Sequence, residues 1–224
     1  MTFSLVARCP RSGQIGVAAA TAMPAVGKLL THARAGLGAV ATQARLNPYL
    51  GIDGLRHLAA GLTAAEVVER LCRDDPRIAT RQMAVVDAAG RTSAWTGPDC
   101  PDWAGSLAGE GFSVQGNRLA GPHVLEAMAA AFLADRALPL AERFLAALEA
   151  GVESGGDTKG EQSATIYIMD TEEYPLWDIR VDQHERPVVE LHRLHDIFRD
   201  QLLPHIKKMP TRANPAGEAG EDDA

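Results

Sequence analysis

The sequence predicts a mixed α+β fold in which two β-sheets are sandwiched between helix layers. Strand-like and helix-like segments follow one another in blocks: strands, helices, strands, helices and strands again. Blocks of this kind are typical of α+β architecture, whereas regular strand–helix alternation indicates a parallel sheet. The 224 residues contain no internal repeat and no low-complexity linker before about Pro210. We therefore expect a single domain over residues 1–208, followed by a tail.

The predicted strands are short β-prone runs bounded by turn-forming residues. Pro10-Arg11-Ser12-Gly13 separates the first two runs, and Asp87-Ala88-Ala89-Gly90 lies between the two strands of a predicted hairpin. Asn47-Pro48 is interpreted as a further turn signal, and residues 24–34 fit either an irregular segment or a short helix. The predicted strands cover residues 2–9, 14–23, 36–43, 81–87, 91–96, 109–116, 163–168 and 176–183.

The predicted helices combine apolar residues at helical spacing with signals at their ends. Thr63-Ala64-Ala65-Glu66 has the spacing of a capping box, and Pro122 suits an early helical position. The predicted helices are one that Gly61 ends and four over residues 63–71, 122–133, 139–150 and 187–206. Residues 209–224 are rich in Pro, Gly, Ala and acidic residues without an apolar pattern, so we expect a disordered acidic tail.

Composition excludes several classes of function. The formal net charge of −7 and the lack of a basic cluster interleaved with aromatics argue against a nucleic-acid partner. No apolar run approaches the roughly 18 residues that span a bilayer, so we expect no membrane partner. The three cysteines are widely separated and form neither CxxC nor a zinc-ligand spacing. We expect a cytoplasmic protein without a metal or a cofactor.

The first strand begins at the second residue of the chain, which is a threonine. If the initiator Met is removed, as a small second residue permits, Thr2 carries a free α-amine. One residue then supplies a hydroxyl nucleophile and its own base, because an α-amine has a pKa of about 7.7–8.0. Taken alone, this feature favours the simpler interpretation that Thr2 is the first residue of a strand.

Four motifs in the same order resemble one known family. The motifs are Thr2-Phe3-Ser4-Leu5-Val6-Ala7-Arg8, residues 35–44, residues 109–117, and Gly155-Gly156-Asp157 with Gly160 and Gln162-Ser163-Ala164. Through roughly residues 2–190 the chain resembles the DUF1028 family, a branch of the N-terminal nucleophile (Ntn) hydrolase fold. The resemblance implies a four-layer αββα sandwich of two mainly antiparallel sheets, like that of proteasome β subunits. It also implies that Thr2 is the nucleophile, exposed by removal of Met1.

The catalytic candidates beside Thr2 are interpreted within that sandwich. Backbone N–H groups near Thr42 and Gln43 would form an oxyanion hole, although a polar strand end facing water fits equally well. Asp157 and Ser163 would form a polar relay that orients the terminal amine; the alternative for Asp157 is a residue of a glycine-rich turn.

The substrate-binding candidates are Thr21, Arg34, Gln115 and Asn117. Gln and Asn side chains both donate and accept hydrogen bonds, which suits an amide or carboxylate, whereas turn formation and helix capping are the alternative. The family pattern commonly has a basic residue near the position of Ala22. Lys28 and Arg34 are candidates to replace it.

Three histidines, His184, His192 and His195, raise the question of a metal site. No nearby acid or cysteine completes a ligand set, so we expect solvent-facing helix residues and no metal site.

The leading functional prediction is an Ntn amidohydrolase that cleaves a small amide-type C–N bond through a Thr2 acyl-ester intermediate. The alternative is a non-catalytic ligand-binding protein on the same sandwich that retains Met1, and a structural scaffold ranks third. We expect a homodimer formed through the outer helices, because residues 121–148 are rich in Leu, Met and Phe.

Overall fold

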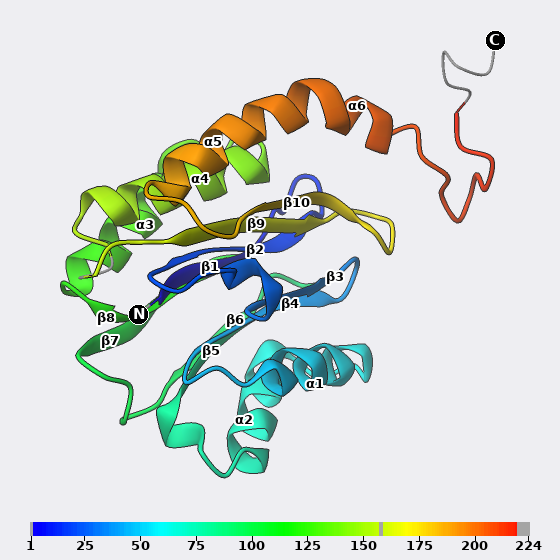
Figure 1. Ribbon diagram of the computed structural model, residues 1–224. Helices are drawn as coiled ribbons and strands as arrows, with labels where there is room; N and C mark the ends of the chain where they lie inside the picture. The colour runs from blue at the N-terminus through cyan, green and yellow to red at the C-terminus, as the bar shows by residue number, and fades with distance from the viewer. Residues whose placement is uncertain (1, 157–158, 219–224) are drawn as a thin grey trace.

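The computed structural model describes residues 2–156 and 159–218, which form two β-sheets between two layers of helices (Figure 1). The larger sheet has the strand order β10-β9-β2-β1-β8-β7 and the smaller sheet the order β3-β4-β5-β6. Every pair of neighbouring strands is antiparallel. The strands are β1 (Thr2–Arg8), β2 (Ile15–Thr21), β3 (Thr31–Arg34), β4 (Gly38–Ala44), β5 (Arg81–Asp87), β6 (Thr92–Thr96), β7 (Trp103–Gly109), β8 (Phe112–Leu119), β9 (Ser163–Met169) and β10 (Pro175–Val181).

The helices form the two outer layers. Figure 1 shows α3, α4 and α5 over the larger sheet, and α1 and α2 against the smaller sheet. The helices are α1 (Pro48–Ala59), α2 (Ala64–Asp74), α3 (Pro122–Ala134), α4 (Leu140–Glu153), α5 (Pro187–Ile197) and α6 (Leu203–Ile206), with short turns η1 (Val26–Lys28), η2 (Ile78–Thr80) and η3 (Phe198–Leu202). The predicted α+β sandwich of two antiparallel sheets between helix layers is confirmed.

Strand β1 lies in the middle of the larger sheet and separates two hydrophobic cores. Phe3, Leu5 and Ala7 belong to the core beneath α3 and α4, whereas Val6 belongs to the core between the two sheets. Because successive side chains of a strand point to opposite faces, Thr2 and Ser4 share the inter-sheet face with Val6. The start of β1 therefore presents hydroxyl groups to the second sheet.

The main sequence predictions for individual elements are confirmed. Strands β5 and β6 form the predicted hairpin. The Thr63 hydroxyl accepts a hydrogen bond from the Glu66 N–H, while the Glu66 carboxylate accepts one from the Thr63 N–H, so the predicted capping box is present. The predicted helix over residues 187–206 is divided by the π-helical turn η3 into α5 and α6.

Three elements differ from their predictions. Asn47-Pro48 is the start of α1 rather than a plain turn, because the Asn47 side chain accepts from the Tyr49 N–H and Pro48 occupies the first helical position. Residues 24–34 divide into η1 and the edge strand β3. Strand β7 was not predicted.

The C-terminal segment after α6 contains neither helix nor strand over residues 209–218. It nevertheless contacts the connection between β9 and β10, where the Tyr174 hydroxyl donates to the Pro210 carbonyl at 3.0 Å. The rest of the predicted disordered tail, residues 219–224, lies outside the described residues. Within residues 2–156 and 159–218, none of the helices has the length and apolar character needed to cross a membrane.

Asp75 ties the helix layer to the smaller sheet. Its carboxylate accepts from Asn47 Nδ2 at 2.8 Å, the Arg77 N–H at 2.8 Å and Arg81 Nε at 3.0 Å. Burial raises the pKa of the Asp75 carboxyl, but these hydrogen bonds outweigh it and hold the pKa below its ordinary value. The ionised carboxylate therefore stabilises the folded state.

We predict that Asp75→Asn lowers the free energy of unfolding by about 2 kcal/mol, because Arg81 loses the charge that compensates its buried guanidinium. A folded-state pKa below the unfolded value means that this stabilisation is complete above about pH 4 and disappears as the pH falls through the folded pKa. Urea titrations between pH 3 and pH 7 measure both effects. Asp74→Asn, an exposed neighbour, is the control; equal curves for the two variants would contradict the role of Asp75.

Candidate functional site

Four predicted site residues form one row across the larger sheet. The antiparallel registers place Thr2 opposite Thr21 on one side and opposite Asn117 on the other, and Thr21 opposite Ser163. The order along the row is Ser163, Thr21, Thr2, Asn117, on strands β9, β2, β1 and β8. Side chains of directly paired residues project from the same face, about 5 Å apart. Residues from four separate parts of the sequence thus meet at one end of the sandwich.

Thr2 is nearly buried within this row, with 9% of its surface exposed. Its Oγ1 atom lies 2.9 Å from Oγ1 of Thr21, so the two hydroxyls share a hydrogen bond. The Thr2 carbonyl receives a long hydrogen bond of 3.5 Å from Gln43 Nε2 on the opposite sheet. Thr21 therefore orients the Thr2 hydroxyl, whereas Gln43 on the facing sheet contacts only the Thr2 backbone.

Ser163 positions a loop rather than the start of β1. Its hydroxyl donates to the Met23 carbonyl at 2.6 Å and accepts from the Val26 N–H at 3.0 Å. These bonds connect β9 to the segment that follows β2. Asp157, its predicted partner in a relay, lies outside the described residues.

A buried polar network joins the two sheets next to Thr2. The Ser4 hydroxyl donates to Gln43 Oε1 at 2.6 Å and accepts from Gln115 Nε2 at 2.7 Å. Gln43 Nε2 in turn donates to Gln82 Oε1 at 2.8 Å. The structure thus places Gln43 and Gln115 together in the core, where they position one another and are at most 2% exposed.

Gln82 is the centre of this network. Its Oε1 accepts from Gln43 Nε2 and, at 3.0 Å, from Asn117 Nδ2. Its Nε2 donates to Thr96 Oγ1 at 2.9 Å and to the Gly116 carbonyl at 2.8 Å. No buried side-chain nitrogen or oxygen of the described residues is left without a hydrogen-bond partner. Asn117 is thereby held in place by a residue that the sequence analysis did not identify.

Thr42 does not supply the predicted oxyanion donor. Its backbone N–H donates to the Leu30 carbonyl at 3.2 Å, and its hydroxyl donates to the Asn47 carbonyl at 3.2 Å. Thr42 lies between Ala41 and Gln43, which face the other sheet, so its own side chain points toward α1. The end of β4 is not a polar strand end facing water either, because Thr42 and Gln43 are both buried.

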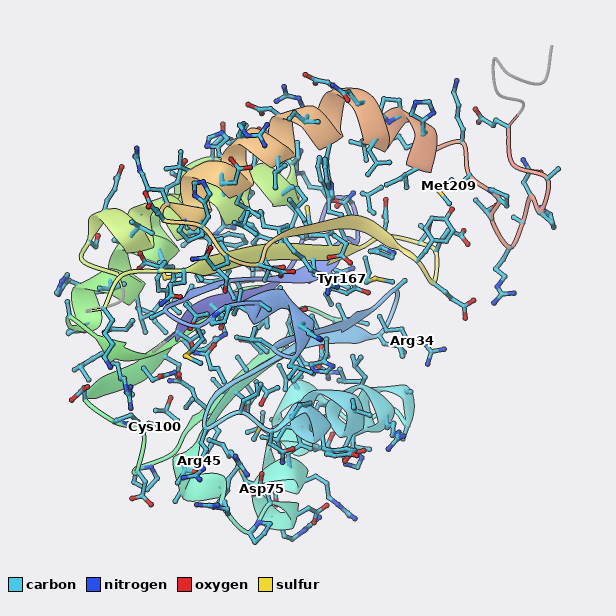
Figure 2. The ribbon with its side chains drawn as sticks, in the orientation of Figure 1. Arg34, Arg45, Asp75, Cys100, Tyr167 and Met209 are labelled. Atoms are coloured by element: carbon cyan, nitrogen blue, oxygen red, sulfur yellow. The ribbon has the colours of Figure 1, made fainter. Side chains whose placement is uncertain are left out.

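Arg34 is not part of this site. It pairs with Gly38 at the start of β4, whereas Gln43 lies five residues further along, a distance of about 17 Å. In Figure 2, Arg34 lies at the right and Arg45, which directly follows β4, at the lower left. The prediction that Arg34 contacts the substrate beside Thr2 is therefore corrected.

A cleft of about 500 Å³ opens at the end of the sandwich where the row lies. Asn117 lines it, as does Ala44, which follows Gln43. Its charged lining residues are Arg45, Arg118 and Asp99. Neither arginine forms an ion pair with an acid of the described residues. The cleft therefore presents two guanidinium groups and one carboxylate close to the start of β1.

Backbone strain is concentrated around the same cleft. Among the described residues, the non-glycine residues with positive φ are Ala25, Ala44, Asp102 and Arg118. Ala44 and Arg118 line the cleft, Asp102 follows the lining residue Pro101, and Ala25 is two residues from the lining residue Met23. Each such residue costs roughly 1–2 kcal/mol in the left-handed region. Strain of this kind tends to accumulate at functional sites.

The burial of the histidines differs in part from the prediction that they are solvent-facing. His195 is 2% exposed and stacks on Trp177 with ring centroids 4.9 Å apart, so it is a core residue rather than a solvent-facing one. Burial lowers the pKa of the His195 imidazole. His192 is about half exposed and contacts Glu149 at 2.7 Å. The described residues contain no cluster of three or more His, Cys, Asp or Glu side chains that could hold a metal ion.

The sandwich and its polar row define an α+β protein whose candidate site lies at the ends of β1, β2, β4 and β8. The family model described as "Family of unknown function (DUF1028)" matches residues 2–191, and the chain belongs to this family, as its motifs indicate.

Two solved structures are similar to the chain. The crystal structure of a DUF1028 protein from Silicibacter pomeroyi is 30% identical, with a TM-score of 0.90 over 98% of this chain and 96% of that chain. Anbu (ancestral beta-subunit) from Yersinia bercovieri is 12% identical, with a TM-score of 0.41 over 93% of this chain and 98% of that chain. The second likeness is too weak to carry an argument. No curated protein matches the chain.

We predict that Gln82→Leu lowers the free energy of unfolding by about 3 kcal/mol or more. The change removes the Gln82 partner of Asn117 Nδ2 and of the Gly116 carbonyl, and leaves Gln43 Nε2 with only two long hydrogen bonds; each unsatisfied buried group costs about 1–3 kcal/mol. Equilibrium urea unfolding measures the loss. Gln201→Leu on an exposed turn should stay within about 0.5 kcal/mol. Similar values for the two variants would show that the network contributes little to stability.

Proposed function

We propose that this protein is an Ntn hydrolase that cleaves a small amide-type C–N bond, with Thr2 as nucleophile after removal of Met1. The observation that carries the proposal is the row in which Thr2 lies between Thr21 and Asn117, because Asn117 also lines the adjoining cleft with Arg45 and Arg118. A hydroxyl in such a place has neighbours that orient it, a facing sheet that excludes water, and an adjoining space for substrate.

The α-amine of Thr2 is the base in this mechanism. A threonine hydroxyl is a weak nucleophile and needs a base within hydrogen-bond reach, which the free amine of the same residue supplies. As Oγ1 forms a bond to the substrate carbonyl carbon, its proton passes to the amine. The amine then gives a proton to the leaving nitrogen as the C–N bond breaks. Water hydrolyses the resulting Thr2 ester, which restores the hydroxyl and releases the acid.

Thr21 and Asn117 have different tasks around that hydroxyl. Thr21 Oγ1, 2.9 Å from Thr2 Oγ1, orients the nucleophile. Asn117 carries two N–H groups on Nδ2; Gln82 Oε1 accepts a hydrogen bond from this nitrogen at 3.0 Å, which leaves the second N–H to stabilise the oxyanion. Gln82 therefore acts as a positioning residue for Asn117. This assignment replaces the Thr42 backbone as the expected donor.

The charges of the cleft narrow the substrate class. Arg45 and Arg118 line it, and the guanidinium geometry matches a carboxylate through paired N–H groups. We therefore propose an amide that carries a carboxylate near the scissile bond, such as an acyl amino acid. The strained backbone at Arg118 fixes the direction in which this side chain leaves β8.

One observation favours a second function. Thr2 is only 9% exposed, and the residues lining the cleft include Asn117 but not Thr2. A ligand-binding protein that retains Met1 would use the same arginines without turnover. The state of the N-terminus distinguishes the two functions, because an unprocessed Met1 blocks the amine.

We predict that active protein purified from cells begins at Thr2, and that Thr2→Ala abolishes turnover while substrate binding survives. The variant keeps the amine and the strand but lacks the hydroxyl. Thr2→Ser and Thr2→Cys should retain part of the activity, since both supply a nucleophile and both permit Met removal. Intact-mass measurement and a panel of small amides, lactams and acyl amino acids test these outcomes. Equal hydrolysis by wild type and Thr2→Ala, or activity in protein that retains Met1, would refute the mechanism.

We further predict that Arg118→Gln raises KM for an acyl amino acid about tenfold and changes kcat little, because a contact to a carboxylate that does not itself react is made equally in ground and transition states. The matched control is Arg56→Gln, which removes an exposed arginine on α1, outside the cleft. An acyl amide without a carboxylate should show no difference between wild type and Arg118→Gln. A fall in kcat alone would place Arg118 in the chemical step instead.

A further inference from the structure

A second cavity lies at the opposite end of the larger sheet from Thr2. Its volume is about 260 Å³, and it is lined by the end of β1, by the turns between β5 and β6 and between β7 and β8, and by residues of α3 and α4. Arg8, which ends β1, is six residues from Thr2, so the two sites are about 20 Å apart. Four arginines line the cavity with one acid: Arg8, Arg11, Arg136, Arg143 and Glu110.

Arg143 is the central residue of this arginine cavity. It is 5% exposed, and its guanidinium lies 3.9 Å from the centre of the Phe132 ring. Its Nε donates to the Phe132 carbonyl at 3.0 Å, in the last turn of α3. That bond uses one of the five N–H groups of the side chain. Among the described residues the structure gives the two terminal nitrogens no acceptor.

Those terminal nitrogens face the cavity. No buried side-chain nitrogen of the described residues lacks a partner, so the terminal nitrogens of Arg143 are not sealed in dry core. Arg143 is also a lining residue of the cavity. Arg143, which is 5% exposed as a whole residue and has no ion pair with a carboxylate of the described residues, therefore presents its terminal nitrogens to an open space.

The positive charge of the cavity is poorly compensated. Arg11 donates from one terminal nitrogen to the carbonyls of Ala137 and Leu138, which are neutral acceptors. Arg136 approaches Glu110 only to 3.9 Å, and the Glu110 side chain is 92% exposed to water. Burial lowers the pKa of the Arg143 guanidinium; the charges of Cys9 and Asp135 raise it, whereas those of Arg136 and Arg11 lower it. Such a cluster is stabilised by a bound anion.

We propose that the arginine cavity binds a small oxyanion carrying two negative charges, of the phosphate or dicarboxylate class. Four guanidinium groups provide planar pairs of N–H donors that match phosphate and carboxylate oxygens. A volume of about 260 Å³ accepts a small metabolite rather than a polymer. The chain as a whole carries a net charge of −7, so the arginine cluster is not simply a consequence of a basic composition. This site is separate from Thr2 and does not depend on the proposed hydrolysis.

Isothermal titration of the full chain tests the proposal, with inorganic phosphate and malonate as probes at constant ionic strength. We expect saturable binding of one equivalent of at least one probe. The probe that binds more tightly identifies the ligand as phosphate-bearing or as a dicarboxylate. Thr2→Ala should bind with unchanged affinity, because Thr2 lies at the other end of the sheet. Unchanged affinity in Thr2→Ala is expected whether or not Thr2 is a nucleophile, so this test is independent of the proposed hydrolysis.

Two variants locate the binding. Arg143→Lys keeps the charge but not the planar donor pair, and Arg136→Gln removes an exposed arginine whose loss leaves the core intact. Each substitution should raise the Kd for the bound probe about tenfold. Arg56→Gln on α1 has the same effect on net charge and should leave Kd unchanged. Absence of saturable binding of both probes up to about ten millimolar, or equal Kd in wild type and Arg136→Gln, would overturn the proposal.

Discussion

The antiparallel register of β1 with both of its neighbours is the constraint on which the candidate site depends. It places Thr2 opposite Thr21 and Asn117, and it turns Phe3 and Leu5 toward the helices. A shift of one residue would exchange these faces, burying hydroxyls among aromatic rings and exposing Phe3 to the polar network. The hydrophobic pattern of β1 thus excludes a one-residue shift, and the observed register brings the four row residues side by side.

The contact between the two sheets is partly polar, and this shapes what the site can do. Alanine and valine fill much of the inter-sheet core, but next to Thr2 the filling consists of Ser4, Gln43, Gln82 and Gln115. A buried amide that lacks its partner is costly, so such a network tolerates few alternative arrangements. Fully paired, it fixes the distance and the offset between the sheets at the point where Asn117 and the start of β1 must be held.

Much of the fold could be predicted from local patterns, whereas the site required the register. The order of strand and helix blocks, the capping box at Thr63 and the hairpin turn are all signals that can be seen within short segments of the sequence. The row joins residues up to 161 positions apart, from Thr2 to Ser163, and only strand pairing brings them together. Spacing could not show that Arg34 pairs with the far end of β4, or that the N–H of Thr42 is bonded to the Leu30 carbonyl just before the edge strand β3. Gln82 had no distinguishing signal, because a glutamine at the start of a strand resembles any polar flank. Strand β7 was missed because Gly105 and Gly109 weaken its β pattern.

The left-handed residues around the cleft have a consequence for how this family can change. Glycine at position 44 or 118 would relieve local strain, so the sequence of highest stability is not the present one. Such a replacement would also make the backbone of the adjacent residues more flexible, because glycine adopts many more conformations than alanine or arginine. Selection for thermal resistance and selection for a precisely shaped cleft therefore act in opposite directions at these positions.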